Sequence, residues 1–429
     1  MNQKFITKLL LAGIFTSTSL TLMAQVEEPV KDTLTLMQEQ IDANASNIKK
    51  IQKFKVSGYI QSQMEISGID GAAKTGANSG KYSSAIDGKD AETFTRYGIR
   101  RGRIKFEYTE GIGKSVFQLD ITEKGVNFKD AYYEVTEPWL NMISLKAGIF
   151  DRCFGDEITY SSSKRESPER TLMFQKLFPD ERDLGAQLTI KAPKGHMLEG
   201  LKLEAGLFSG NGIKVDDNGK LDFIGHLKYD KKLDNISFGI GTSYYSGTTN
   251  NADTMFYNVV DGAWKAEKQE SNKLNKREYI GVDAQFSAET FMGLTNIRAE
   301  YVMGTQPSTK GDFSSPKADS YSAAKPFNYN RKFSGYHAYL VQDIYKTPLS
   351  LVIKYAFLDQ NSDLKGDEIK NNTDLAMTSL GYGLLWKATK DLRLQAFFET
   401  NTNEKSNNLT GYDVDKKDNI FTLRLQYKF

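Results

Sequence analysis

The sequence contains one cysteine, Cys153, among 429 residues. A single cysteine forms no intramolecular disulfide, and it builds neither a cysteine-cluster zinc site nor an iron–sulfur cluster. The three histidines, His196, His226 and His337, lie far apart in the sequence and match no metal-ligand motif. We therefore expect no metal and no cofactor.

An excess of charge of one sign is also missing, since 56 lysines and arginines are balanced by 54 aspartates and glutamates. Proteins that bind nucleic acids are usually clearly basic, so we expect no nucleic-acid partner. The common catalytic motifs are missing as well. The segment from Gly111 to Ser115 resembles the end of a phosphate-binding loop, but Tyr108 occupies the position that requires glycine. We expect that the chain is not an enzyme.

Long hydrophobic runs are limited to the N-terminus. Lys4 and Lys8 precede an apolar stretch that ends at Leu22, and Ala24-Gln25 offers a cleavage point, so residues 1–24 are predicted to be a signal peptide. Beyond residue 24 no apolar run reaches the length of a transmembrane helix. An exported chain of this kind that spans a membrane must do so as a closed β-barrel.

Residues 33–52 are predicted to form a helix. Apolar residues recur at spacings of three and four, with one polar position, in the heptad pattern of a coiled coil: Leu34, Met37, Ile41, Asn44, Ile48 and Ile51. A helix of this length is marginally stable alone in water. Two hypotheses follow for the periplasmic segment 25–53: a short trimeric coiled coil under a barrel, or a linker helix.

From Phe54 onward the period of the hydrophobic pattern changes to two. Segments of about ten residues alternate between apolar and polar side chains, which is typical of transmembrane β-strands. We predict sixteen strands near 54–66, 94–109, 113–124, 127–137, 141–150, 183–192, 199–208, 221–230, 234–246, 275–288, 293–303, 333–344, 348–359, 374–388, 391–402 and 417–429. Connections after even-numbered strands are short, whereas most of the others are long and polar. The sequence therefore predicts an all-β protein, a transmembrane antiparallel barrel of about 16 strands over residues 54–429, preceded by a short periplasmic helix.

The final segment, from Phe421 to Phe429, places apolar residues at every odd position and ends on an aromatic residue. It resembles the terminal strand by which the barrel-assembly machinery identifies outer-membrane proteins. Phe429 is our candidate assembly signal, and an ordinary amphipathic edge strand is the alternative.

Three segments together resemble the phosphate-selective porin family, also called the porin O and P family. They are Arg96–Phe106; the stretch Lys146–Phe150, Phe154–Glu157, Glu169-Arg170 and Pro179–Gly185; and Gly206–Gly212. The resemblance implies a bacterial outer-membrane porin, a homotrimer of sixteen-stranded barrels. It also implies luminal arginines and lysines that pass small anions such as phosphate.

Candidate channel-lining and anion-binding residues follow from strand alternation and from the long segment 151–182, where porins place their constriction. They are Arg100, Arg101, Arg103, Lys105, Lys146, Arg152, Arg165, Arg170 and Arg182. Gly102 marks a possible bulge that decides whether Arg100 or Arg101 faces inward. Six cations against seven acids in residues 151–182 leave a weakly selective pore as the alternative.

The sequence therefore predicts a porin of the Gram-negative outer membrane that is surrounded by lipid and gives passive diffusion to small hydrophilic solutes, anions among them. The alternative is a non-conducting surface barrel that acts as an adhesin, receptor or structural protein. Loss of charge at Arg101 and Arg103 is expected to shift the reversal potential toward cations.

Overall fold

The computed structural model describes residues 32–75, 80–81, 92–213, 216, 218–251, 254–269, 274–316 and 327–429. The predicted signal peptide, residues 1–24, lies outside the described residues. The chain divides into two units, Met1–Gln52 and Lys53–Phe429. Among the described residues, no helix has both the length and the apolar character needed to cross a membrane.

The described part of the first unit is the helix α1 (Thr33–Gln52), as predicted. None of its residues is buried. The apolar residues of the heptad pattern are exposed along its length, with Leu34 at 73% and Ile51 at 70%. The helix therefore presents an apolar stripe that no described residue of its own unit covers.

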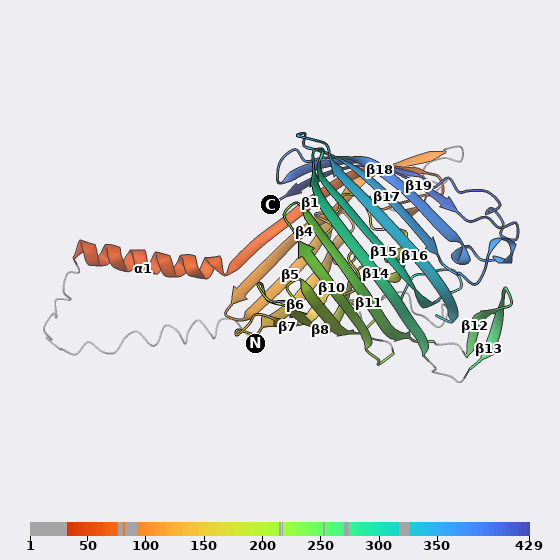
Figure 1. Ribbon diagram of the computed structural model, residues 1–429, viewed down its shortest axis with the longest axis horizontal. Helices are drawn as coiled ribbons and strands as arrows, with labels where there is room; N and C mark the ends of the chain where they lie inside the picture. Colours follow the sequence, from red (N-terminus) through yellow and green to blue (C-terminus); the bar gives the residue numbers. More distant parts are fainter. Residues whose placement is uncertain are drawn as a thin grey trace, which may run out of the picture. The chain divides into compact units, whose positions relative to one another are not determined.

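The second unit is a closed antiparallel barrel (Figure 1). Its sheet contains 18 strands, and sixteen of them form the wall, because β12 and β13 stand outside it as a hairpin. The first wall strand, β1, pairs with both β4 and β20, which closes the barrel. The wall strands are β1 (Phe54–Gly68), β4 (Thr93–Glu110), β5 (Gly113–Thr122), β6 (Gly125–Thr136), β7 (Ile143–Asp151), β8 (Arg182–Lys191), β9 (Leu201–Phe208), β10 (Asp222–Lys232), β11 (Ile236–Thr249), β14 (Asn275–Thr290), β15 (Gly293–Ser308), β16 (Tyr329–Asp343), β17 (Leu349–Asp359), β18 (Ala376–Trp386), β19 (Leu392–Asn403) and β20 (Ile420–Lys428).

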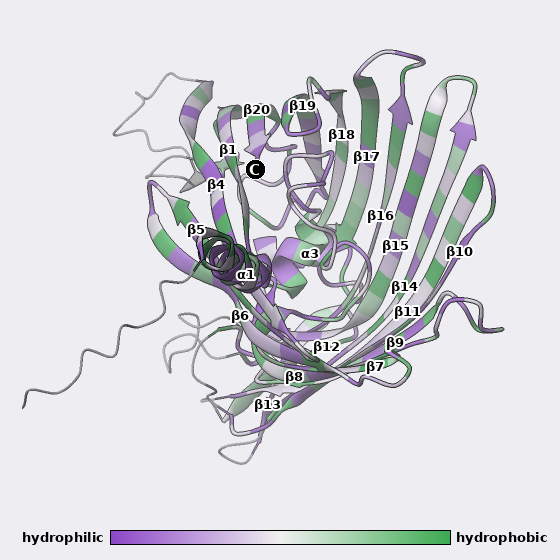
Figure 2. Ribbon diagram, turned by 90° about the vertical axis from the view of Figure 1, so that its left-hand side faces the viewer, coloured by the Kyte–Doolittle hydropathy of each residue, from purple (hydrophilic) through white to green (hydrophobic). Residues whose placement is uncertain are grey.

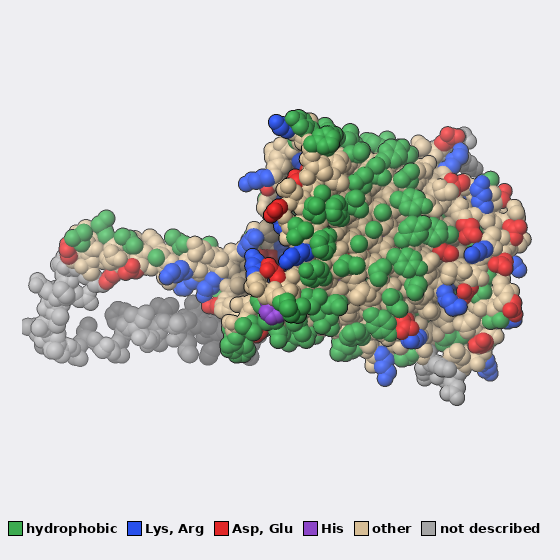
Figure 3. Space-filling model, viewed as in Figure 1, with side chains coloured by type: hydrophobic (Ala, Val, Ile, Leu, Met, Phe, Trp, Pro, Cys, Tyr) green, Lys and Arg blue, Asp and Glu red, His purple; other side chains and the backbone are tan. Residues whose placement is uncertain are grey.

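The sixteen predicted strands are confirmed, each within a few residues of its expected limits. Alternation sorts their side chains as expected. On β11, Phe238 and Ile240 are 40% and 60% exposed on the outer wall, whereas Ser243 on the opposite face is 3% exposed. Figure 3 shows the resulting band of hydrophobic side chains over the strands. The outer wall is therefore apolar, and the inner wall carries the polar residues.

Several short elements lie in segments that are predicted to be loops. They are the small hairpin of β2 (Ala72–Ala73) and β3 (Gly80–Lys81), the hairpin of β12 (Met255–Val260) and β13 (Ala263–Lys268), the helix α3 (Leu172–Leu177), and two single 3₁₀ turns, η1 (Gly366–Glu368) and η2 (Asn372–Asp374). The β12 strand contacts the wall through one parallel bridge, between Tyr257 and Tyr329. Except for β12 and β13, which an Asp261-Gly262 turn joins, these elements are too short for a periodic pattern to reveal them.

A β-bulge in β4 settles the orientation of its arginines. Gln61 of β1 pairs with Arg101, but the next residue, Ser62, pairs with Ile99. Arg100 is therefore the extra residue of the bulge, and regular alternation resumes at Arg101. Arg101 is 3% exposed and Arg103 5% exposed, both on the inner wall. The bulge that we expected near Gly102 lies at Arg100, and both Arg100 and Arg101 reach the same inner partner, described below.

Candidate channel and constriction

The segment between β7 and β8, residues 152–181, folds into the barrel, and we call it the inserted loop. Figure 2 shows its helix α3 inside the ring of strands. Three of its aromatic residues, Phe154, Phe174 and Phe178, are at most 1% exposed. They belong to a hydrophobic cluster that they share with inward residues of the wall. The inserted loop is therefore a packed part of the barrel interior.

Aromatic contacts fix one side of the inserted loop to the wall. The ring of Phe178 lies 6.1 Å from that of Tyr245 and 6.0 Å from that of Tyr279. The ring of Phe154 contacts Tyr279 from 6.3 Å at an interplanar angle of 88°. Edge-to-face pairs at such separations add specific geometry to the burial of apolar surface. This side of the loop is anchored to β11 and β14.

Charged contacts fix the opposite side, at Glu169. Its carboxylate accepts hydrogen bonds from Arg100 (2.8 Å, twice), Arg101 (3.1 Å) and Arg424 (2.9 Å). Arg424 also donates to the carbonyl of Pro168 at 2.7 Å. Three guanidinium groups from β4 and β20 thus converge on one acid of the loop. Charge-assisted bonds of this kind are about twice as strong as neutral ones.

Between these two anchors, the backbone of the loop crosses the lumen and accepts hydrogen bonds from polar wall residues. Gln61 donates to the carbonyl of Ser162 at 3.1 Å, and Gln426 donates to that of Ser163 at 3.1 Å. Gln395 donates to the carbonyls of Arg165 and Glu166. The wall therefore satisfies backbone groups that would otherwise be left unpaired inside the protein.

Five of the predicted site residues are brought together around one cavity of about 330 Å³ at the short-turn end of the strands: Arg103, Lys105, Lys146, Arg170 and Arg182. Lys428 joins them, so six cations line this space against three acids, Asp130, Asp151 and Glu181. We call it the basic cavity. The ammonium of Lys146 lies 4.3 Å from the ring centre of Phe150, a cation–π contact.

Several of these cations also take part in ion pairs. Arg182 binds Asp130 at 3.0 Å and Asp151 at 2.9 Å, and Arg170 pairs with Glu181. Arg103 lies 3.6 Å from Asp120. Because these pairs are largely buried, they fix the geometry of the cavity wall. Lys146 and Lys428 form no ion pair with any residue in the described part of the chain, so their charge is not offset by a direct partner.

The remaining predicted loop arginines stand apart from the basic cavity. Arg152 is fully buried and pairs with Asp183 at 2.9 Å, so its role in the structure is to attach the start of the loop to β8. Arg165 is 2% exposed, and its three guanidinium nitrogens have no hydrogen-bond partner among the described residues. It borders a space of about 10 Å³ beside Glu157, Arg298 and Tyr339.

The outer side of the inserted loop carries the opposite charge. A cavity of about 710 Å³ there is lined by six acids, which are Glu65, Asp70, Glu169, Asp312, Glu399 and Asp418. Three lysines face them, Lys74, Lys176 and Lys416. Among the lining residues, acids therefore outnumber cations on the side toward the long loops, and cations outnumber acids on the side toward the short turns. The nearly balanced charge composition of the whole chain does not reveal this separation of charged residues.

Sequence reasoning missed the residues that position the inserted loop. Glu169 lies in a family-like segment, but nothing in the sequence marks it as the residue that positions the loop. The aromatic anchor does have a sequence signal. Strand alternation turns four aromatic residues inward: Phe208, Tyr245, Tyr279 and Phe333. A water-filled lumen would favour polar residues at these positions. Inward aromatics on neighbouring strands indicate a docking face for something apolar inside the barrel. No comparable pattern marks Gln61, Gln395 and Gln426.

Comparison with known proteins identifies a matching family and similar solved structures. The family model for phosphate-selective porin O and P matches residues 98–429. No curated protein matches the sequence. Similar solved structures include the anion-selective porin from Comamonas acidovorans (TM-score 0.50, 12% identity, 88% of this chain and 99% of that chain). They also include the outer membrane channel DcaP of Acinetobacter baumannii (0.52, 13%, 88% and 97%) and Salmonella typhi OmpF in complex with daunomycin (0.55, 11%, 88% and 97%). At these identities the structural likeness establishes the fold.

Proposed function

Because this chain belongs to the phosphate-selective porin O and P family and is an outer-membrane channel, we propose that it conducts small anions, phosphate among them, and selects them at the basic cavity. One observation carries the proposal: six cations and three acids surround a space of about 330 Å³ beside the inserted loop. Family membership favours a channel without catalytic activity. We also propose that residues 1–24 are removed and that 25–53 form a periplasmic segment.

The small size of the basic cavity is what makes its charges effective. In physiological salt, water and ions screen charges over roughly 8 Å. Charges on the wall of a wide pore are therefore weak determinants of selectivity. In the basic cavity, Arg103 and Arg182 are at most 7% exposed. Both arginines pair with acids, so the charges that act most directly on an anion in this narrow space are those of Lys146 and Lys428.

We predict that the double substitution Arg103→Gln, Lys146→Gln shifts the reversal potential in a salt gradient toward cations. The physical reason is that two of the six cations that line the basic cavity lose their charge, and Lys146 is one of the two without an ion-pair partner among the described residues. Planar-bilayer recordings with refolded protein measure the shift. Arg101, which sequence alone singles out together with Arg103, is a weaker choice because it does not line the basic cavity.

The matched control is Lys310→Gln, which removes one charge from an exposed outer-loop residue and is expected to leave the reversal potential unchanged. An unchanged reversal potential in the double variant would contradict selection at the basic cavity. The same recordings test the alternative of a surface barrel that acts as an adhesin, receptor or structural protein. Folded protein that gives no channels would support that alternative.

A homotrimer is the assembly that we propose, supported by the family and by the exposed stripe of α1. Leu34, Met37, Ile41, Ile48 and Ile51 are each more than half exposed on this helix. Apolar residues in a heptad pattern become stable when two or more helices bury them together. Three copies of α1 in a short coiled coil would bury the stripe.

We predict that deletion of residues 33–52 weakens the trimer more than the barrel. Crosslinking in native membranes, followed by electrophoresis with and without heating, reports the two separately. The deletion variant is expected to keep the heat-modifiable barrel band and to lose most of the crosslinked trimer. If wild-type protein crosslinks as a monomer only, the trimer proposal is wrong.

A further inference from the structure

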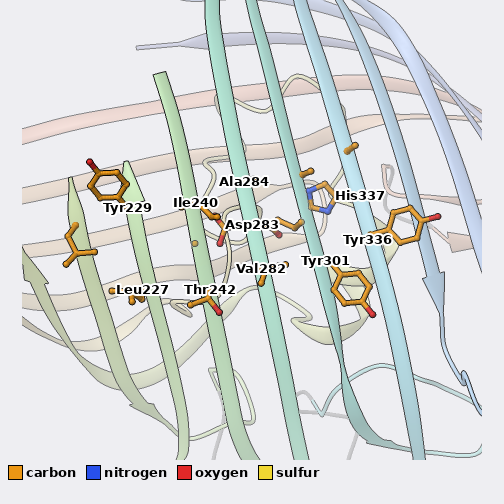
Figure 4. A pocket seen from close by; sticks show the side chains of 15 residues that line it. Leu227, Tyr229, Ile240, Thr242, Val282, Asp283, Ala284, Tyr301, Tyr336 and His337 are labelled. Carbon is orange, nitrogen blue, oxygen red and sulfur yellow. The ribbon is translucent and has the colours of Figure 1, made fainter. Parts of the chain in front are cut away.

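The outer wall of the barrel contains an apolar groove of about 660 Å³ that the proposed channel function does not use. Figure 4 shows side chains that line it, on strands β10, β11, β14, β15 and β16. Leu227 and Ile240 are 43% and 60% exposed, and Tyr301 and Tyr336 are 40% and 41% exposed. The volume lies in the range of about 300–1,000 Å³ that is usual for small-molecule sites.

Strand register explains why the wall is hollow here. Ala284 of β14 pairs with Ala299 of β15, which in turn pairs with Ala338 of β16. Three alanines therefore lie side by side across three strands and form the floor. The row on one side contains the paired tyrosines Tyr301 and Tyr336. The groove is a furrow between bulky rows, oblique to the membrane normal because barrel strands are tilted by about 35–45°.

The row on the other side of the floor is also bulky, and it begins with a cation. Phe238 of β11 pairs with Phe286 of β14 and, across β10, with Lys231. Lys231 follows Leu227 and Tyr229 at alternate positions of β10, so it points outward with them. It is exposed and forms no ion pair with any residue that the structure describes. The strand ends one residue later, at Lys232.

This end of β10 faces the periplasm in the topology of outer-membrane barrels, because a short turn, residues 233–235, follows it. The groove thus lies in the half of the outer wall that contacts the inner leaflet of the outer membrane. Lys231 lies two residues beyond Tyr229 on the same face of β10, and Tyr229 lines the groove together with the three alanines. A cation at the membrane surface followed by an apolar furrow is complementary to an anionic headgroup followed by an acyl chain.

We propose that this groove is a binding site for a phospholipid of the periplasmic leaflet, with its phosphate at Lys231 and one acyl chain over Ala284, Ala299 and Ala338. The proposal is independent of the solute that the channel passes. Bulk lipid chains are as apolar as the groove, so burial of apolar surface gives no preference for it. The preference comes from the fit of the chain between the aromatic rows and from the contact between Lys231 and phosphate.

A lipid is favoured over a second copy of the chain because this is the tall side of the barrel. Strands β14, β15 and β16 contain 16, 16 and 15 residues. At the usual tilt they cover the roughly 25 Å apolar band that lipid requires, with residues to spare. Strands β7 and β9 contain 9 and 8 residues and cover less than that height. The low side is the better place for contacts between subunits.

Photocrosslinking tests the proposal. The probe is phosphatidylglycerol with a photoactivatable group on its acyl chain, in vesicles of phosphatidylethanolamine and phosphatidylglycerol that contain the full-length refolded protein. Crosslinked peptides are mapped by mass spectrometry. We expect wild-type crosslinks to concentrate in β14–β16. Ala299→Phe, which fills the furrow, is expected to abolish them there, and Lys231→Gln to reduce them several-fold.

The matched control is Ala396→Phe, which places the same ring on the outer wall at β19, away from the groove. It is expected to leave the crosslinks in β14–β16 unchanged. Heat-modifiable mobility and channel conductance verify that each variant folds. Crosslinks spread evenly around the wall, or unaffected by Ala299→Phe, would overturn the proposal. Dissociation of the oligomer by Ala299→Phe would also overturn it, because the groove would then be a subunit contact.

Discussion

Replacement of Glu169 by glutamine is expected to release part of the inserted loop and to raise the single-channel conductance. The carboxylate binds Arg100, Arg101 and Arg424 together, and the side chains of Arg101 and Arg424 are at most 3% exposed. Removal of one partner from a buried ion pair costs about 3–5 kcal/mol, because the remaining charges stay buried without compensation. Here three arginines lose their common anion. The loop residues around 162–169 then leave the lumen, and solvent reaches the freed guanidinium groups.

Planar-bilayer recordings measure the amplitude and noise of the current, and trypsin cleavage after Lys164 or Arg165 reports exposure of the loop. The control is Asp363→Asn, which removes an acid paired with Lys332 at the protein surface, where ion pairs contribute about 0–1 kcal/mol. The control is expected to behave like the wild type. Wild-type currents and protease resistance in the Glu169→Gln variant would show that the loop is fixed without this acid.

Deletion of Phe429, or its replacement by serine, is expected to reduce sharply the amount of barrel assembled in the outer membrane. The backbone N–H of Phe429 donates to the carbonyl of Gly58, and the N–H of Gly58 donates to the carbonyl of Phe429, each at 3.0 Å. The aromatic ring lies over Gly58, where a Cβ atom would approach the ring within 2.6 Å. We propose that this exposed terminal ring is what the barrel-assembly machinery recognises.

Heat-modifiable mobility of outer-membrane fractions measures assembly. A matched variant is Leu425→Ser, which removes an outward apolar side chain of similar exposure from the same strand. If the terminal position carries a signal, Phe429→Ser assembles far less well than Leu425→Ser. Equal amounts of assembled barrel for the two variants would show that Phe429 has no special role beyond that of any other outward apolar residue.

The wall of the barrel could be predicted from the sequence because each strand carries its own signal. Ile236, Phe238 and Ile240 alternate with small or polar residues whatever their partners are, and the sixteen strands follow from such local patterns. The hairpin of β12 and β13 has a local signal that the prediction of a polar loop overlooks, because Asp261-Gly262 forms a two-residue turn after the mostly apolar strand Met255–Val260.

The candidate site depends on pairings that no local pattern reveals. Arg101 and Arg103 are two residues apart on one face, which alternation shows, but their surroundings differ. Arg101 meets an acid that is 68 positions away in the chain, and Arg103 borders a cavity with more cations than acids. Composition alone counts six cations and seven acids in the loop segment. Acids from other segments line the side of the loop toward the long loops, so the lining residues of the two cavities differ in balance although the loop segment itself is nearly neutral.

The closure of the barrel between β1 and β20 has a consequence for how the protein is made. Gln61 and Gln426, which meet at this closure, are 365 residues apart in the chain. Pairings between such distant segments carry a large loop-closure entropy and make folding slow. Until the last strand arrives, β1 and β19 each present an unpaired edge, and exposed edges of this kind promote aggregation. Every shorter translation product therefore keeps two unpaired strand edges. A complete chain must also be protected from aggregation with other copies in the periplasm until β20 pairs with β1.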